Sequence, residues 1–296
     1  MKDEGCLPSI QNVTSFVDRF GCRDHDKNFN KIVNSFGKFA NSKFTQLQAI
    51  YGALGAQEAL KTASGLYNPI KQFLLYDCDE ILIGLKHTKD KANARDVSGL
   101  RNILGNKLFK KLTSKKIFVV GSGAIGCEIL KNLSAMDIGT RKSKGGSVIL
   151  TDMDTIEKSN LSRQLLFRDG DVGKFKSLAA EEAMQRMNPK VHIKSLTSKI
   201  GDDSKGETYF DAKFWSDGVD IVLNALDNVE ARLFIDSQCV ANRKALIDAG
   251  TLGAKGNVRV VVPRQSESYG SSVDPPEPTI PVCTLKNFPY EISHTI

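Results

Sequence analysis

The pattern of apolar and polar residues changes about a third of the way along the chain. From residue 100 onward, short apolar runs alternate with segments of helical periodicity, which predicts an α/β fold with a mostly parallel sheet covered on both faces. The expected strands are Lys116–Val120, Ser147–Thr151, Val191–Leu196, Asp220–Asn224, Ala245–Asp248 and Asn257–Val262. The expected helices are Leu100–Leu112, one that opens within Gly121–Gly126 and ends at Ala135, Gly173–Met187, Glu207–Ser216 and Val229–Asn242.

The first third of the chain is more polar and predicts a mainly helical segment. Apolar positions recur at helical spacing in residues 43–64, Gly65 suits the end of that helix, and its small residues predict close packing against a neighbour. Ile70–Tyr76 predicts a short strand, and the charged residues 86–98 predict a surface connection. Residues 1–42 show only weak helical periodicity.

Composition and charge then exclude several classes of protein. The chain has 296 residues, 41% apolar and 25% charged, which is an ordinary globular composition. No apolar run approaches the ~18 residues that span a bilayer, and the start lacks the apolar core of a signal peptide. We therefore expect no membrane association and a cytoplasmic and nuclear location. The net charge of +7 suits an anionic ligand, but the basic residues are not interleaved with aromatic ones, so no nucleic acid is expected.

The six cysteines and four histidines do not have the spacing of a metal site. No two cysteines form a C-x-x-C pair, and the histidines lie far apart in the sequence. A zinc site and a thioredoxin-type redox site are therefore disfavoured, and most of the cysteines are expected to be buried free thiols.

A glycine-rich segment follows the first expected strand. Gly121, Gly123 and Gly126 form a G-x-G-x-x-G pattern between a strand and a helix. In nucleotide-binding loops of this kind the first glycine permits a tight turn, the second lets the backbone approach phosphate, and the third lets the helix pack on the strand. The helix N-terminus also favours an anion. Many strand-to-helix turns need glycines for packing alone, but this context favours nucleotide binding.

Two acidic residues follow the second expected strand. Asp152 ends that strand and Asp154 lies close by, where an acid holds ribose hydroxyls in dinucleotide folds. Its spacing from Gly121 exceeds the usual ~20 residues, and the insert Gly139–Gly146 accounts for the excess. The alternative is a turn residue at the end of a strand.

Cationic and amide side chains follow these acids. The segment Asn160-Leu161-Ser162-Arg163-Gln164 precedes Gly173-Lys174-Phe175-Lys176. Arginine can fork onto phosphate oxygens and lysine acts as a point charge, so this set suits a triphosphate better than a dinucleotide. The alternative is a solvated helix face, which we favour for Lys174.

The segment Asn224-Ala225-Leu226-Asp227-Asn228 lies where a parallel strand is expected to end. Ligands bind at the carboxyl ends of strands in open α/β sheets, and Mg²⁺ prefers one or two carboxylates together with nucleotide phosphates. Asp227 is therefore a candidate metal ligand. The alternative is an N-cap, a role that suits either Asp227 or Asn228, and both interpretations can hold.

One cysteine stands apart from the expected core elements. Cys283 lies in Pro281-Val282-Cys283-Thr284-Leu285, after residues 270–281, whose four prolines predict irregular structure; a helix is expected after Pro289. A thiolate is a good nucleophile toward an activated acyl group, although most cysteines are structural.

Taken in order, these motifs resemble those of the ubiquitin-activating enzyme family. The resemblance covers residues from about 43 to the end and is strongest over 116–289. It rests on the segments GSGAIGCE, TDMDTIEKSNLSRQ, GKFKS, NALDN, GTLGAKGN, ESYGSSVDPPE and PVCTLKNFP.

The resemblance implies a Rossmann-like, ThiF/MoeB-like adenylation domain that uses ATP and Mg²⁺. The implied reaction is adenylation of the ubiquitin C-terminal carboxylate, then a thioester on Cys283 and transfer to a ubiquitin-conjugating enzyme. Arg163 and Lys176 would assist the chemistry with Cys283, and Asp227 would bind Mg²⁺. The implied nucleotide-binding residues are Gly121, Gly123, Gly126, Asp152, Asp154, Asn160, Arg163, Gln164, Lys176 and Asp227.

The resemblance also divides the chain into three parts. Residues 1–98 would be the tail of a helical bundle and an inactive adenylation half, 99–278 the active adenylation domain, and 279–296 a crossover segment and the start of a catalytic-cysteine domain. We therefore expect a fragment that is weak or inactive alone. Its expected partners are ubiquitin, conjugating enzymes and the remainder of its own chain.

Four alternative functions are consistent with parts of the pattern. One is activation of a different ubiquitin-like modifier, and another is a nicotinamide-dependent oxidoreductase, in which Arg163, Lys176 and Asp227 have no role. A non-catalytic scaffold half would not need those residues either. A sulfur-carrier adenylyltransferase usually has paired C-x-x-C zinc ligands, which this chain lacks. In addition, the Arg-Tyr-x-x-Gln segment that precedes the nucleotide-binding strand in ubiquitin-activating enzymes is not recognisable in Asp96–Leu104 of this chain.

Overall fold

The computed structural model describes residues 44–74, 76, 99–201, 209–252 and 255–271, which fall into two compact units that divide between Leu112 and Thr113. In the first unit, helix α3 (Thr45–Ser64) confirms the predicted helix and ends at Gly65, whose φ of 66° is the left-handed conformation of a helix C-cap. No residue of α3 is buried, and a Cβ added at Gly52 or Gly55 would meet no atom within 4 Å. The predicted close packing is therefore absent among the described residues.

The segment after α3 corrects one prediction. The described residues of Ile70–Tyr76 form no strand, since Gln72 has a φ of 69°, which interrupts an extended backbone. The segment is tied to α3 instead: the Ile70 N–H donates to Glu58 Oε2 at 3.0 Å. The connection predicted at residues 86–98 lies outside the described residues.

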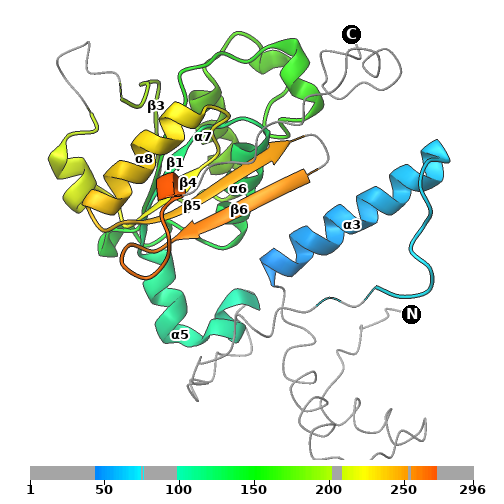
Figure 1. Cartoon of the computed structure of the whole chain (residues 1–296), viewed down its shortest axis with the longest axis horizontal. Coiled ribbons are helices and arrows are strands. Elements are labelled where there is room, and N and C mark those ends of the chain that lie inside the picture. The colour runs from blue at the N-terminus through cyan, green and yellow to red at the C-terminus, as the bar shows by residue number, and fades with distance from the viewer. Residues whose placement is uncertain (1–43, 75, 77–98, 202–208, 253–254, 272–296) are drawn as a thin grey trace, which may run out of the picture. The chain divides into compact units, whose positions relative to one another are not determined.

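The second unit contains a six-stranded sheet that confirms the predicted α/β class (Figure 1). All neighbouring strands are parallel except the last pair, in which β6 runs antiparallel to β5 at the edge. In spatial order the strands are β3 (Ile193–Leu196), β2 (Ser147–Thr151), β1 (Lys116–Val120), β4 (Ile221–Asn224), β5 (Ala245–Leu252) and β6 (Lys255–Val261).

The strand order reverses between β1 and β4, so the carboxyl ends of these two strands form the switch point at which open α/β sheets bind ligands. Helices α6 (Ala124–Ala135) and α7 (Lys176–Met187) connect β1, β2 and β3, and α8 (Val229–Ala241) connects β4 to β5 across the other face (Figure 1). The helix predicted at Leu100–Leu112 is α5 (Gly99–Thr113), which breaks at Gly105 and lies almost entirely in the first unit. Helix α7 begins three residues later than predicted because Gly173, with a φ of 88°, makes a left-handed turn.

An aromatic cluster fixes β1 beneath the switch point. Phe118 of β1 is fully buried and lies 5.0 Å from Phe214 and 6.0 Å from Trp215, ring centre to ring centre, in edge-to-face contacts. Both partners belong to a short π-helix, Phe214–Gly218, where an α-helix was predicted; residues 202–208 of that prediction lie outside the described part of the chain. Ile235 and Cys239 of α8 complete this core. None of the described helices is long and apolar enough to cross a membrane.

Candidate functional site

The loop after β1 requires glycine at two positions because the backbones approach closely. Gly121 has a φ of 93°, and a Cβ there would lie 2.6 Å from the Ala225 carbonyl oxygen. A Cβ on Gly126 would lie 2.1 Å from the Gly121 carbonyl oxygen, so the first turn of α6 packs directly on the loop. The left-handed φ of Gly121 agrees with its predicted role in a tight turn, and the contact at Gly126 agrees with its predicted role in helix packing.

Gly123 differs from the other two glycines because its surroundings are open. Its nearest neighbour, Gln164 Nε2, lies 4.0 Å from where a Cβ would be. Gly123 is the N-cap residue of α6, and none of the described side chains caps this helix. The first N–H groups of a helix have no partner within it, so this helix start offers donors to an anion.

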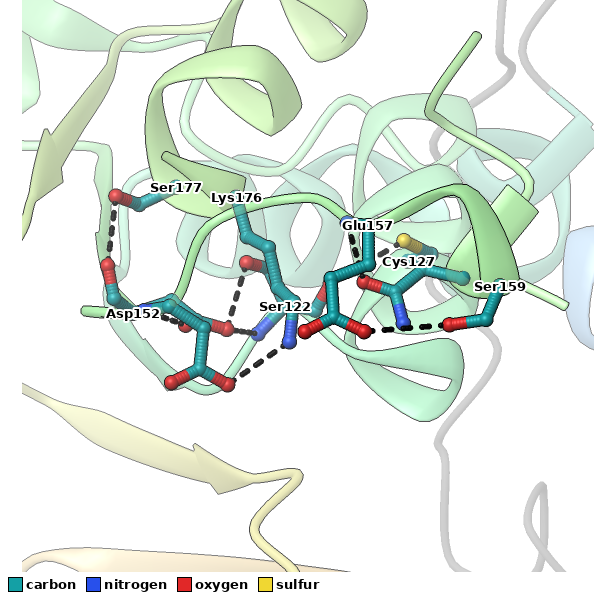
Figure 2. Close-up of polar contacts among 9 residues, drawn as sticks. Ser122, Cys127, Asp152, Glu157, Ser159, Lys176 and Ser177 are labelled. Carbon is teal, nitrogen blue, oxygen red and sulfur yellow. Dashed lines mark hydrogen bonds and ion pairs between the residues drawn. The ribbon is translucent and has the colours of Figure 1, made fainter. Parts of the chain in front are cut away.

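Asp152 binds the glycine-rich loop (Figure 2). Its Oδ2 accepts hydrogen bonds from the Ser122 N–H at 2.7 Å and from Ser122 Oγ at 2.9 Å, and its Oδ1 accepts one from the Asp154 N–H at 2.9 Å. The Asp152 carbonyl accepts from Ser177 Oγ at 3.0 Å, at the start of α7. Asp152 therefore connects the ends of β1 and β2 to α7, a structural role that the sequence analysis missed.

Lys176 and Asp154 form an ion pair at the first residue of α7. Lys176 Nζ lies 2.8 Å from Asp154 Oδ2, with the lysine side chain 12% exposed and the aspartate side chain 58% exposed. An ammonium group has three donors, so two remain beyond this contact. Lys174 is exposed, as predicted, and its ammonium group pairs with Asp171 at 2.8 Å, which lowers the pKa of that carboxyl.

The segment between β2 and α7 brings the remaining predicted residues beside the loop. Asn160 is buried, and its Oδ1 accepts a hydrogen bond from the Glu157 N–H at 3.0 Å in a capping box. Arg163 is exposed and donates from Nη1 to the Ser159 carbonyl at 3.0 Å. Gln164 is only 4% exposed, and its Oε1 has no hydrogen-bond partner within the part of the chain that the structure describes. A buried unpaired amide oxygen is costly, so Gln164 is suited to receive a donor from a ligand.

The loop after β4 presents one free carboxylate. The Asp227 side chain is exposed and has no partner among the residues that the structure describes. Asn228 caps α8, because its Oδ1 accepts from the Ala231 N–H at 3.0 Å. The N-cap interpretation is thus confirmed for Asn228, and the metal-ligand interpretation of Asp227 stays a prediction. Ala225 of the same loop touches Gly121.

A buried polar network supports the loop after β4 from below. Asn224 Nδ2 donates to Asp248 Oδ1 at 3.0 Å, and Arg232 Nη1 lies 3.6 Å from Asp248 Oδ2. Arg232 also donates from Nε and Nη2 to the Leu226 carbonyl, at 3.1 and 2.5 Å. The sequence pattern did not predict these contacts. The sequence did contain one indication that Asp248 has a role: like Asp152, it is an acid close to the carboxyl end of an expected parallel strand.

The predicted nucleophile Cys283 lies outside the described residues. The two described cysteines are Cys127 on α6 and Cys239 on α8, and both are fully buried free thiols. Burial raises the pKa of Cys127 to about 11 and that of Cys239 to about 12, so neither is an activated nucleophile.

The structure therefore brings the predicted loop, acids, cations and amides to one edge of the sheet. Hydrogen bonds join Ser122, Asp152, Asp154 and Lys176, while Gln164 adjoins Gly123. Backbone N–H donors, the Asp152 carboxylate and the Asp227 carboxylate, which has no partner among the described residues, all follow strands that end at the switch point. Such a set can bind a nucleotide and stabilise negative charge that develops on its phosphates.

Comparisons with known proteins agree with this arrangement. The family described as "ThiF family" matches residues 93–294. The chain is 46% identical over 269 residues to ubiquitin-like modifier-activating enzyme 1 of Homo sapiens, covering 90% of this chain and 25% of that protein. It is 45% identical to ubiquitin-activating enzyme E1 1 of Candida albicans (strain WO-1), covering 100% of this chain and 30% of that protein. The chain thus spans about a quarter of these relatives, and the resemblance to ubiquitin-activating enzymes is confirmed.

A solved structure is also similar to the chain. The crystal structure of E. coli MccB with MccA-N7isoASN is 25% identical, with a TM-score of 0.46, and the match covers 55% of this chain and 44% of that one.

Proposed function

Because the chain belongs to the ThiF family, we propose that its glycine-rich sheet edge binds MgATP and adenylates the C-terminal carboxylate of ubiquitin. A thioester on Cys283 and transfer to a conjugating enzyme would follow. The observation that carries the proposal is the start of α6 beside Gln164: among the described residues no side chain caps this helix, and the buried Gln164 Oε1 has no partner. This chain alone would act weakly, since its relatives are about four times as long.

The nucleotide would be held by groups from three elements. Backbone N–H groups at Gly123 and the start of α6 would receive phosphate oxygens. Asp152 Oδ1 accepts one N–H in the structure, and a carboxylate oxygen can accept more than one donor, so it can also take a ribose hydroxyl. Arg163 is exposed, whereas Lys176 is largely buried in its ion pair with Asp154, and we propose that both charges face the phosphates.

The donor set also fits Mg²⁺. Mg²⁺ keeps several waters and binds one or two carboxylates together with substrate phosphates. Asp227 offers an exposed carboxylate without a partner among the described residues, beside the loop that would hold the phosphates. When bound there, Mg²⁺ would supply positive charge against the phosphate oxygens.

The reaction would then proceed by two displacements. The ubiquitin carboxylate oxygen attacks the α-phosphorus, the bond to the bridging oxygen breaks, and pyrophosphate leaves; Arg163 and Lys176 would stabilise the charge that develops. The Cys283 thiol loses its proton to solvent, the thiolate attacks the acyl carbon, and AMP leaves with the bonding electrons. Exchange with a cysteine of the conjugating enzyme would complete the transfer.

ATP–pyrophosphate exchange with and without ubiquitin tests the proposal, on this chain and on one extended to the length of its relatives. We expect exchange that requires ubiquitin and falls at least ~100-fold in Asp227→Ala, since charge stabilisation at such sites is worth this much. Asp217→Ala is the matched control. Asp217 is also exposed, but it precedes β4 and therefore lies at the amino ends of the parallel strands, away from the proposed site. A ubiquitin thioester should be lost in Cys283→Ala.

Two outcomes would contradict the proposal in different ways. Exchange that is unchanged in Asp227→Ala would remove this carboxylate from the site. No exchange with ubiquitin in the extended chain would show that the modifier is wrong, and other ubiquitin-like modifiers would then be tested.

A further inference from the structure

The residues on both sides of Asp227 are fixed, although Asp227 itself is not. The Leu226 side chain packs against the hydrophobic core, and its carbonyl accepts two hydrogen bonds from Arg232. On the other side, Asn228 caps α8. Asp227 lies between these anchors, exposed and without a partner among the described residues. The backbone that carries Asp227 is therefore held on both sides by its neighbours.

Arg232 is held in place by a site built for a guanidinium group. Its side chain is 12% exposed and its Nη1 lies 3.6 Å from Asp248 Oδ2, whose side chain is 3% exposed. A Cβ added at Gly250 would lie 2.8 Å from Arg232 Nη2, so the guanidinium lies against bare backbone. Asn224 holds the other oxygen of Asp248 at 3.0 Å.

A buried ion pair of this kind is weak evidence for stability, since desolvation offsets most of the attraction between its charges. Its better-attested use is to select one conformation. Here the selected conformation is that of the Leu226 carbonyl, because a forked guanidinium can donate to one oxygen through two nitrogens at once.

We propose that Arg232 is a positioning residue for the metal site: through the Leu226 carbonyl it orients Asp227 before the metal arrives. The inference rests on the proposed function. Mg²⁺ demands near-ideal octahedral geometry, so a ligand already in the correct direction binds it at a lower ordering cost. Groups that orient a metal ligand commonly change metal affinity 10–100-fold when they are replaced.

Arg232→Lys separates this role from charge balance. Lysine keeps a positive charge beside Asp248 but cannot fork onto the Leu226 carbonyl. Asp248→Asn is the matched variant, since it removes the ion pair while Arg232 retains both bonds to Leu226. If Arg232 had only a structural role, the loss of Mg²⁺-dependent ATP affinity would parallel the loss of melting temperature in both variants.

Calorimetry of ATP binding in Mg²⁺ and in EDTA, with melting measured alongside, provides the test. We expect Arg232→Lys to weaken ATP binding about tenfold in Mg²⁺ and to leave it unchanged in EDTA. Asp248→Asn should lower the melting temperature while the ratio of the two affinities stays within about twofold of wild type.

The outcomes distinguish this inference from the function on which it rests. If wild-type binding responds to Mg²⁺ and loses that response in Asp227→Asn, while Arg232→Lys behaves like wild type, the positioning role is wrong and the proposed function stands. If wild-type binding ignores both Mg²⁺ and Asp227→Asn, the metal site is wrong and the positioning role falls with it.

Discussion

The loops after β1 and β4 lie side by side at the switch point, yet they are built in different ways. The β1 loop is made of backbone: Gly121 and Gly126 bring main-chain atoms together, and Gly123 leaves the start of α6 open. The β4 loop depends on side chains instead. Arg232 donates to the Leu226 carbonyl and Asn228 caps α8, so the residues on either side of Asp227 are held in place.

This difference matches the charge that each loop would bind. Backbone N–H groups are fixed partial positive charges and suit an anion, whereas a cation requires a carboxylate. A carboxylate is mobile unless its neighbours fix it. A loop that presents a side chain therefore needs supporting residues, whereas a loop that presents its backbone needs only the absence of side chains.

The largest effect should come from filling the closest contact of the β1 loop. In Gly126→Ala the new methyl group would meet the Gly121 carbonyl, a backbone atom that cannot move without α6. We expect a loss of about 3 kcal/mol of unfolding free energy or more, measured by urea denaturation.

Gly123→Ala is the matched control, because its nearest neighbour is 4.0 Å away. It should leave unfolding within about 0.5 kcal/mol of wild type and weaken ATP binding. Equal stability losses in the two variants would contradict the contrast between a packing glycine and a ligand-facing one.

A smaller effect is expected from the acid that ties β2 to the β1 loop. Asp152→Asn places an amide N–H₂ either against the Ser122 donors or against the Asp154 N–H, and it removes the charge that strengthens these bonds. Unfolding free energy should fall by about 2 kcal/mol and ATP binding should weaken.

Ser122→Ala provides the graded comparison, because it removes only the hydroxyl bond and keeps the backbone one. It should cost about 1 kcal/mol in the same urea titration. A larger cost for Ser122→Ala than for Asp152→Asn would show that Asp152 does not organise the loop.

The smallest effect is expected at the two buried thiols, which can serve as probes of the two loops. Cys127 follows the β1 loop along the chain, and Cys239 follows the β4 loop. Burial raises both pKa values, to about 11 and about 12, so neither thiol should alkylate at neutral pH until the chain unfolds. Between the pKa of the unfolded thiols, near 9, and the native values of about 11 and about 12, only the unfolded thiols ionise, so the free energy of unfolding should fall as pH rises through this range.

The contrast between the loops should appear in the labelling rates measured by mass spectrometry. ATP should slow labelling of Cys127 more than that of Cys239, because Cys127 Sγ contacts the Ser122 carbonyl at 3.5 Å. Rapid alkylation of either thiol in the native chain would contradict its burial.

The sheet and the β1 loop could be predicted from the sequence because their signals are local. Strands Lys116–Val120 and Ser147–Thr151 match their predictions residue for residue, since each is an apolar run bounded by polar residues or glycine. The glycine spacing likewise predicted the tight turn at Gly121 and the close packing of α6 at Gly126, while the approach of phosphate at Gly123 remains a prediction. The roles assigned to Asn160, Arg163 and Asp227 toward a ligand remain predictions.

The remaining features depend on contacts between distant residues. Arg232 and Asp248 are 16 residues apart and lie on a helix and a strand, so no spacing rule pairs them. The strand predicted at Ile70–Tyr76 was wrong because the prediction rested on the apolar residues of the segment. The left-handed backbone at Gln72 could not be predicted from its residue type. The π-helix at Phe214 similarly follows from packing three aromatic rings around Phe118.

The aromatic cluster beneath β1 also gives this protein a built-in optical reporter. Trp215 is the only tryptophan of the chain, and it is 2% exposed. Its indole emission therefore reports the α/β unit alone, whatever the rest of the chain contributes to other signals. Because its ring contacts Phe118, three residues before Gly121, a shift in that emission during a nucleotide titration would follow the β1 loop without any introduced label.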